Sequence, residues 1–127
     1  EDLIEAVLSG LWAKMSPDMS DALDVIQQQG KERQHIFALY AITGGVKQAG
    51  FDKIKACPDK VLLPVALEAL QLMDMPESTA ALQSAMEAEK RADDYNAPYS
   101  DAFDAEDGKE KMVAYVRSHP EGFVDLA

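Results

Sequence analysis

The segment that most constrains the fold is IFALYAI, residues 36–42, because it is apolar on every side of a helix. A helix that is apolar all round belongs in the interior of a protein. We therefore expect a helix from about residue 31 to residue 43 to be the most buried element. Gly44-Gly45 follows, and we expect these two glycines to break the helix, since glycine is a poor helix former.

The other apolar residues repeat at intervals of three and four, as on one face of a helix, and no stretch alternates as a strand would. This spacing predicts further helices over about 2–15, 17–29, 62–74, 77–95 and 108–118, with a short helix inside 46–57. Pro64 falls in a first helical turn, where proline is tolerated, and Asp107 can cap the last helix. The sequence thus predicts an all-α fold of about six or seven helices in a single domain, 1–127.

Residues 96–108 are expected to be mostly loop, with one helical turn around Tyr99 to Phe103. Tyr95 and Tyr99 flank this acidic loop. Exposed aromatic side chains among acids would suit a protein interface. The alternative is that the two tyrosines hold the loop against the core.

The charge of the 127-residue chain is strongly negative, at −11. Residues 1–60 hold nine acids and seven bases, a balance of −2, whereas residues 61–127 hold fourteen acids and five bases, a balance of −9. Nucleic-acid backbones and anionic membranes are poor partners for such a chain. The C-terminal half is therefore the anionic half, and we expect no direct binding of nucleic acid.

The cellular compartment is indicated by three features. Cys57 is the single cysteine and cannot form an internal disulfide, so we expect an inert thiol in a reducing compartment. No apolar run approaches the roughly 20 residues of a membrane helix. The start, EDLIEAVLSGLWAKM, lacks the basic leader of a signal peptide. We therefore expect a cytoplasmic protein with no membrane partner.

Negative charge is densest in DDYNAPYSDAFDAED, residues 93–107, where six of fifteen residues are acidic and none is basic. One interpretation is a solvated loop with helix ends, since acids near helix N-termini are common. The other is a charge array, because helical residues i and i+4 lie about 6 Å apart along the axis, similar to the regular charges of a nucleic-acid strand. Asp18, Asp21 and Asp24 form a second short series.

The sequence contains no recognisable motif for catalysis or metal binding. An EF-hand loop with Gly108 at its sixth position would begin at Phe103, which is not a ligand. His35 and His119 lie in unrelated segments, and no HExxH, paired CxxC or glycine-rich phosphate loop occurs. We therefore predict no catalytic residue, no metal ligand and no cofactor.

Three segments together resemble a known family: ALYAITGGVKQAGFDKI (38–54), ALEALQLMDMPESTAALQSAMEA (66–88) and YNAPYSDAFDAEDGKEKMVAYVRSHPEGF (95–123). In this order they resemble the bacterial DNA-mimic-protein-like domain family over about 31–123. Its Val-Asn-Asn-Gly-Gly-Phe turn is matched at Val46, Gly50 and Phe51, while Lys47, Gln48 and Ala49 depart from it. The third segment fits at Asp101, Phe103, Asp104, Tyr115, Val116, Arg117, His119 and Phe123.

The resemblance implies an all-helical cytosolic protein, often a homodimer, and for its best-known type a protein that occupies the DNA-binding surface of a transcription regulator. Our first hypothesis is therefore an acidic helical interaction protein, a DNA mimic that binds a basic, DNA-binding protein. The carboxylates expected to act together are Asp18, Asp21, Asp24, Glu87, Glu89, Asp93, Asp94, Asp101, Asp104, Glu106 and Asp107.

Two alternatives stay open. The first is an immunity or antitoxin-like inhibitor that covers the basic site of a toxin, since such inhibitors are often small, acidic and helical. The second is a hydrolase or metal-dependent enzyme. That enzyme would bring carboxylates together around His35 or His119 and shift their pKa values. Carboxylates on a convex face would favour mimicry, and carboxylates in a cleft would favour chemistry.

Overall fold

The computed structural model describes residues 4, 7–9, 22–28, 30–56 and 58–119 of the chain. The elements with assigned bounds are α2 (Ala22–Gln27), α3 (Lys31–Gln48), α4 (Phe51–Lys55), the 3-10 helix η1 (Pro58–Leu62), α5 (Leu63–Leu72), α6 (Pro76–Glu87), the 3-10 helix η2 (Ala92–Tyr95), α7 (Asn96–Ala105) and α8 (Gly108–Ser118). Every regular element among these residues is a helix, which confirms the all-α fold. None of the helices described has the length and apolar character that a membrane span requires.

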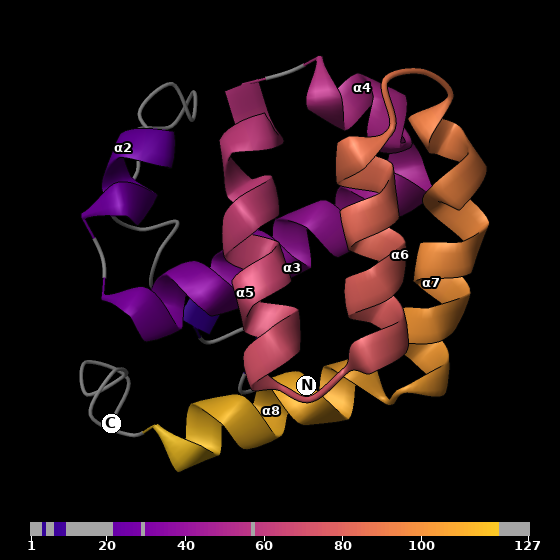
Figure 1. Cartoon of the computed structure of the whole chain (residues 1–127). Coiled ribbons are helices and arrows are strands. Elements are labelled where there is room, and N and C mark those ends of the chain that lie inside the picture. The colour runs from indigo at the N-terminus through magenta and orange to yellow at the C-terminus, as the bar shows by residue number, and fades with distance from the viewer. Residues whose placement is uncertain (1–3, 5–6, 10–21, 29, 57, 120–127) are drawn as a thin grey trace.

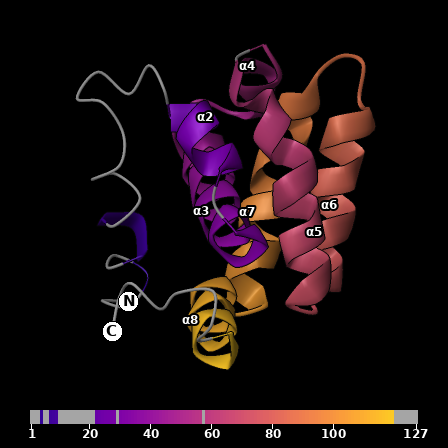
Figure 2. The same cartoon turned by 90° about the vertical axis from the view of Figure 1, so that its left-hand side faces the viewer.

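The helices are arranged in two layers. α5 and α6 lie side by side in Figure 1, and the side view shows them packed against a second layer of α3 and α7. α8 lies across the lower end of both layers in the two views (Figure 1, Figure 2). The predicted helix over 2–15 falls only partly within the described residues, where Ile4, Val7 and Leu8 are helical and buried.

α3 is the central helix, as the sequence predicts. Ile36, Leu39 and Ile42 are at most 1% exposed and form the middle of the core. The helix is not buried all round, because Tyr40 is 47% exposed. The run IFALYAI therefore has an outer side that reaches the surface.

Gly44-Gly45 does not end α3, and this prediction is wrong. The helix continues to Gln48, and its last turn places Val46 in the core with 3% exposure. Burying one aliphatic side chain contributes about 1.5–3 kcal/mol, which offsets the roughly 1 kcal/mol that a glycine costs in a helix. The break comes at Gly50 instead, where φ is +91° and the chain turns into α4.

α6 ends at Glu87, not near residue 95 as expected. Ala88 is extended, and Arg91 has a left-handed backbone with φ of +60°. The Lys55 ammonium donates hydrogen bonds to the carbonyl oxygens of Ala85 and Ala88. The last carbonyls of a helix lack partners within it, so Lys55 stabilises the early end of α6.

α7 replaces the loop that was expected over 96–108. Tyr99 and Phe103, one helical turn apart, are 0% and 3% exposed. The Tyr99 hydroxyl is 2.9 Å from Thr43 Oγ1, and its ring meets Phe51 edge to face at a centroid distance of 5.7 Å. The alternative that Tyr99 holds this segment against the core is therefore correct, and Tyr95 is half-buried.

The predicted bounds of α8 are confirmed, and Pro64 lies in the first turn of α5 as expected. The prediction that the Asp107 side chain caps α8 is wrong. Asp107 occupies the cap position with φ of +57°, but its carboxylate makes no capping hydrogen bond. Gly108 follows it, and a Cβ there would lie 2.3 Å from the Phe103 ring. This close approach, rather than a side-chain cap, fixes the junction of α7 and α8.

Candidate functional site

The eleven carboxylates predicted to act together do not form a single group. Asp18 and Asp21 lie outside the described residues. Asp24 is exposed on α2, which is at the opposite edge of the molecule from α7 (Figure 1). The other eight lie between the end of α6 and the start of α8: Glu87, Glu89, Asp93, Asp94, Asp101, Asp104, Glu106 and Asp107.

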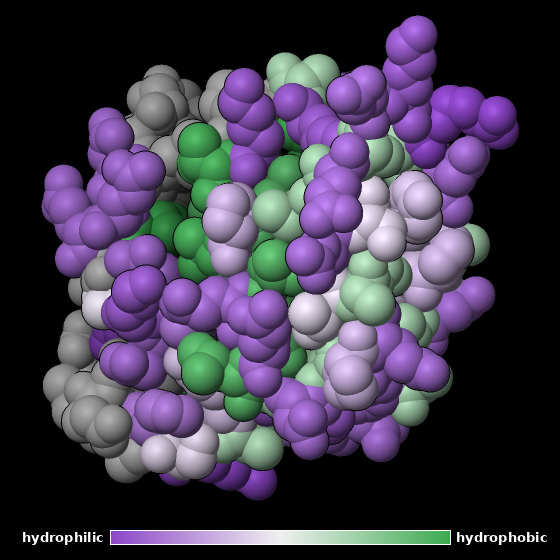
Figure 3. Space-filling view, in the orientation of Figure 1, coloured by the Kyte–Doolittle hydropathy of each residue, from purple (hydrophilic) through white to green (hydrophobic). Residues whose placement is uncertain are grey.

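Six of these eight form what we call the outer acidic edge: Glu87, Glu89, Asp94, Asp101, Asp104 and Asp107, all of them exposed. α7 sets the direction of Asp101 and Asp104, because Tyr99 and Phe103 of the same helix face the core and these two aspartates face solvent. A helix of ten residues such as α7 spans about 15 Å. Hydrophilic side chains also gather at the upper right of the surface, over the connection between α6 and α7 (Figure 3).

Glu106 has an internal role. Its Oε1 accepts hydrogen bonds from the Ser78 amide at 2.8 Å and the Ser78 hydroxyl at 2.7 Å, and its Oε2 accepts one from the Glu77 amide at 3.1 Å. Partial burial raises the pKa of Glu106, but these hydrogen bonds and the nearby Lys111 outweigh it and lower the pKa overall. Glu106 therefore caps the first turn of α6, which would otherwise expose unpaired amides.

Asp93 is also engaged inside the fold, in a reciprocal arrangement with Asp52. Asp93 Oδ1 accepts a hydrogen bond from the Asp52 amide at 2.9 Å, and Asp52 Oδ1 accepts one from the Ala92 amide at 3.0 Å. Asn96 Oδ1 accepts the Phe51 amide at 2.9 Å. The starts of α4 and η2 therefore cap each other across the turn at Gly50.

Gly50 makes that reciprocal capping possible. A Cβ at this position would lie 2.4 Å from Asp93 Oδ1 and 2.8 Å from Asn96 Nδ2. Its φ of +91° with ψ of 164° is a conformation that essentially only glycine adopts. In the turn that matches the family pattern, Gly50 is thus required for structure, while Lys47 and Gln48 belong to the end of α3.

The outer acidic edge has few internal partners. Asp94 forms an exposed ion pair with Arg91 at 3.3 Å, and Gln83 donates a 3.4 Å hydrogen bond to Glu87. Exposed pairs of this kind contribute little. Within the part of the chain that the structure describes, no hydrogen bond or ion pair engages the carboxylates of Glu89, Asp101, Asp104 and Asp107.

A second polar constellation lies between α3, α5 and α8. His35 Nδ1 is 2.7 Å from the Tyr115 hydroxyl, and His35 Nε2 is 2.6 Å from Glu68 Oε1. An ionised carboxylate only accepts hydrogen bonds, so His35 Nε2 donates to Glu68, while Nδ1 pairs with the Tyr115 hydroxyl. The Lys31 ammonium also donates to Glu68 Oε1, at 3.2 Å. We call His35, Glu68 and Tyr115 the buried triad, in which His35 and Tyr115 are buried and the Glu68 side chain is 46% exposed.

The environment of the buried triad shifts two pKa values. The hydrogen bond from His35, and then the contact with Lys31, lower the pKa of Glu68. Burial, followed by the negative charges of Glu32 and Glu68, raises the pKa of Tyr115 to about 12. Both groups therefore hold the protonation states that the hydrogen bonds need at neutral pH.

The buried triad partly matches the enzyme hypothesis, which placed carboxylates with shifted pKa values around a histidine. Among the described residues, the carboxylate hydrogen-bonded to His35 is that of Glu68 alone, and His35 and Tyr115 are 3% and 7% exposed. Its geometry satisfies buried polar groups and connects three helices. Among the described residues, no three His, Cys, Asp or Glu side chains lie together as a metal site requires.

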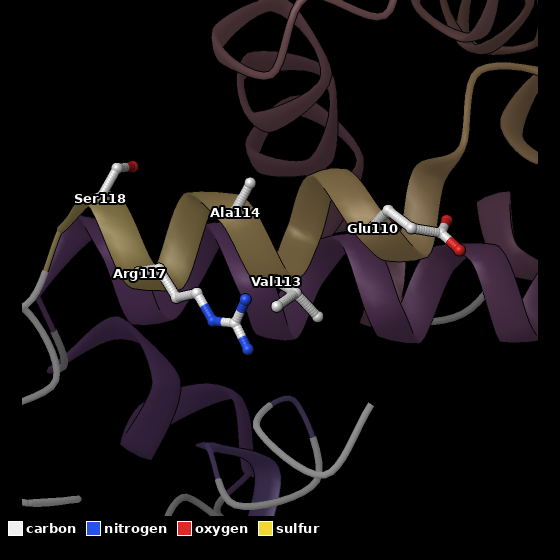
Figure 4. Close-up of a pocket in the computed structure, with 5 residues that line it drawn as sticks. All are labelled: Glu110, Val113, Ala114, Arg117 and Ser118. Atoms are coloured by element: carbon white, nitrogen blue, oxygen red, sulfur yellow. The ribbon is translucent and has the colours of Figure 1, made fainter.

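A shallow hollow runs along the outer side of α8. It is lined by Glu110, Val113, Ala114, Arg117 and Ser118, which project from this one helix (Figure 4). Among the described residues that line it, Glu110 and Arg117 are one acid and one base, so their charges balance. The described part of its lining is therefore the surface of a single helix.

Sequence reasoning missed Asp52, Glu68 and the hydroxyl of Tyr115. Their partners lie 33 to 80 residues away along the chain, so a single sequence carries no signal for the pairs. Comparison of the chain with protein-family models, curated proteins and solved structures found no match. The resemblance to the DNA-mimic-like family therefore stays a prediction.

Proposed function

We propose that this protein is a non-enzymatic interaction protein that binds the basic surface of a DNA-binding protein through the outer acidic edge, as a DNA mimic. The observation that carries the proposal is the set of exposed carboxylates that the described fold leaves without partners, Glu89, Asp101, Asp104 and Asp107. Nearby Asp93 and Glu106 are hydrogen-bonded inside the fold. The unpaired set repels itself, and a basic partner relieves that repulsion.

The shape of the edge supports binding rather than chemistry. Asp101 and Asp104 are exposed on α7, a helix at the margin of the molecule (Figure 1). A protein that binds DNA presents Lys and Arg to phosphates spaced along a rod. Asp101 and Asp104 of α7 lie about 4.5 Å apart along the helix axis and can offer neighbouring negative charges to those side chains.

Binding of this kind depends on the sum of the charges. Complementary potentials accelerate encounter and set specificity more than they add affinity. Each exposed carboxylate contributes little alone, and salt screens the attraction over roughly 10 Å at 0.1 M. We therefore expect a steep loss of binding when several edge carboxylates are neutralised, and a weaker effect of the same change at high salt.

The test is a low-salt pull-down from the source lysate, followed by mass spectrometry of the eluate and competition with double-stranded DNA. The edge variant is Glu89→Gln with Asp101→Asn and Asp104→Asn. The matched control removes three exposed carboxylates elsewhere, with Asp24→Asn, Asp74→Asn and Glu110→Gln.

The proposal predicts that the native chain and the control variant retain a basic DNA-binding protein. It also predicts that DNA displaces this protein and that the edge variant does not retain it. Equal retention by all three baits would mean that the edge only keeps the protein soluble. A toxin-like enzyme that is retained instead would favour the inhibitor hypothesis.

A further inference from the structure

A groove between α6 and α7 lies beside the outer acidic edge. Its floor consists of alanines from both helices, Ala80 and Ala81 of α6 and Ala102 and Ala105 of α7. Glu77 and Asp101 line it as well, one from each helix, and both are exposed. Of the described residues that line the groove, none is basic.

The alanine floor limits what the groove can hold. Alanine side chains leave the backbones of α6 and α7 close to the surface, so another segment can approach closely. The trough between two packed helices accepts the ridge of a third. Large aromatic anchors need a deep pocket, whereas this groove is an open trough of about 480 Å³.

Lysine and arginine side chains fit both parts of the groove. Their aliphatic stems cover apolar surface while their charged heads stay in water or reach a carboxylate. The stems would lie over Ala81 and Ala102, and the heads would reach Glu77 and Asp101. We infer that the α6–α7 groove seats a helical segment of the basic partner that carries Lys and Arg along one face. This inference rests on the proposed function and says which segment of the partner is bound.

A second copy of this chain is a poor occupant of the same groove. A two-fold contact would place this face against itself, and Glu77 and Asp101 of one copy would meet the same carboxylates of the other. With a net charge of −11 on each chain, such a contact is repulsive. The hollow on α8 is a weaker candidate for a basic segment, because Arg117 lines it beside Glu110.

The experiment titrates the protein into a labelled helical peptide rich in alanine, lysine and arginine, at low salt, and follows fluorescence anisotropy. Ala80→Leu with Ala105→Leu fills the groove without changing the charge, and both positions are exposed, so the fold tolerates them. Ala114→Leu makes the same change in the hollow of α8 as a control. Glu77→Gln with Asp101→Asn removes the charge without filling the groove.

We expect the groove-filling pair to weaken peptide binding about tenfold or more and the Ala114→Leu control to bind as the native chain does. The Glu77→Gln, Asp101→Asn pair should also weaken binding, with a smaller salt dependence. Circular dichroism checks that each variant remains helical.

The failure of this inference is distinguishable from the failure of the proposed function. If Glu89→Gln with Asp104→Asn weakens peptide binding while the groove-filling pair does not, the groove is not the seat, although the outer acidic edge binds. If none of these variants changes binding, both proposals are wrong. A proline-interrupted peptide of the same charge that binds as tightly as the helical one would also overturn the inference, because the groove is proposed to hold a helix.

Discussion

Asp104 and Glu106 are two residues apart, but they belong to two regions of the molecule. In one region the carboxylate accepts hydrogen bonds within the fold, and in the other it does not. Glu106 turns toward α6 and accepts three hydrogen bonds from Glu77 and Ser78. Asp104 faces solvent, and nothing within the described residues engages its carboxylate. The acidic residues of 93–107 therefore form two groups. An inner group holds elements together, and an outer group is left for a partner.

Carboxylates accept hydrogen bonds within the fold at three places, and acids outside 93–107 take part in two of them. Asp52 and Asp93 cap each other's helices, Glu106 caps α6, and Glu68 accepts the hydrogen bond of a buried histidine. A hydrogen bond in which one partner is charged is stronger than one between neutral groups. These acids accept hydrogen bonds within the fold, and outer ones such as Asp104 do not. Substitution of an inner acid should therefore lower the free energy of unfolding, whereas substitution of an outer acid should leave it nearly unchanged.

The largest expected effect is at Gly50, where the reciprocal capping of Asp52 and Asp93 is closest. Gly50→Ala should lower the free energy of unfolding by about 3 kcal/mol or more, because a Cβ is strained at this φ and displaces the Asp93 carboxylate. Urea unfolding followed by circular dichroism measures it. The control is Gly44→Ala, whose Cβ meets nothing within 4 Å inside α3, and which should be neutral or stabilise by up to about 1 kcal/mol. Equal tolerance of both changes would contradict the strain at Gly50.

The stability that the buried Tyr99 of α7 gives to the fold should decrease at alkaline pH. Burial raises the pKa of Tyr99 from 10.0 to about 12, although its hydrogen bond with Thr43 opposes this. The neutral phenol is thus favoured in the fold, and its stabilisation is complete below pH 10 and is lost as the pH rises to about 12. The loss should reach about 3 kcal/mol. Urea unfolding at several pH values measures it, and Tyr99→Phe should remove this part of the pH dependence. An unchanged profile in Tyr99→Phe would show that another group is responsible.

The buried triad should couple α3 to α8. His35→Ala leaves the Tyr115 hydroxyl without this hydrogen-bond partner, and Tyr115→Phe does the same to His35 Nδ1. Each change should cost about 1–3 kcal/mol, and together they should cost less than the sum. A double-mutant cycle measured by urea unfolding should give a coupling of about 1 kcal/mol. Additive losses would mean that the 2.7 Å contact contributes no energy of its own.

Local signals in the sequence were enough for part of the fold. Pro64 marks the first turn of α5, and the apolar spacing of residues 108–118 gives the bounds of α8. The errors at Gly44-Gly45 and over 96–108 have one cause. At the first place, the last turn of α3 buries Val46 in the core. At the second, Tyr99 and Phe103 pack on distant residues. In both, this packing outweighs the local preference of glycines or acids for a loop.

The candidate site was predictable only in outline. Composition shows that 93–107 is acidic, but not that Asp93 and Glu106 are engaged while Asp101 and Asp104 are not. The separation depends on Asp52 and Ser78, which lie 41 and 28 residues away from their partners. Without related sequences or a structure, no spacing rule connects residues so far apart.

The smallest effect gives the sharpest test of the two kinds of carboxylate. Glu106→Gln should cost about 1 kcal/mol, as the loss of a charged helix cap does, whereas Asp104→Asn should stay within about 0.5 kcal/mol or stabilise slightly by easing repulsion. The lowered pKa of Glu106 determines how its contribution to stability changes with pH. Its stabilisation is present above the ordinary carboxyl value of 4.5 and is lost as the pH falls below it. Urea unfolding at neutral pH should therefore separate the two variants, and at low pH Glu106→Gln should approach the native chain. If Asp104→Asn costs as much as Glu106→Gln at neutral pH, the outer acidic edge is part of the fold and not a surface kept for a partner.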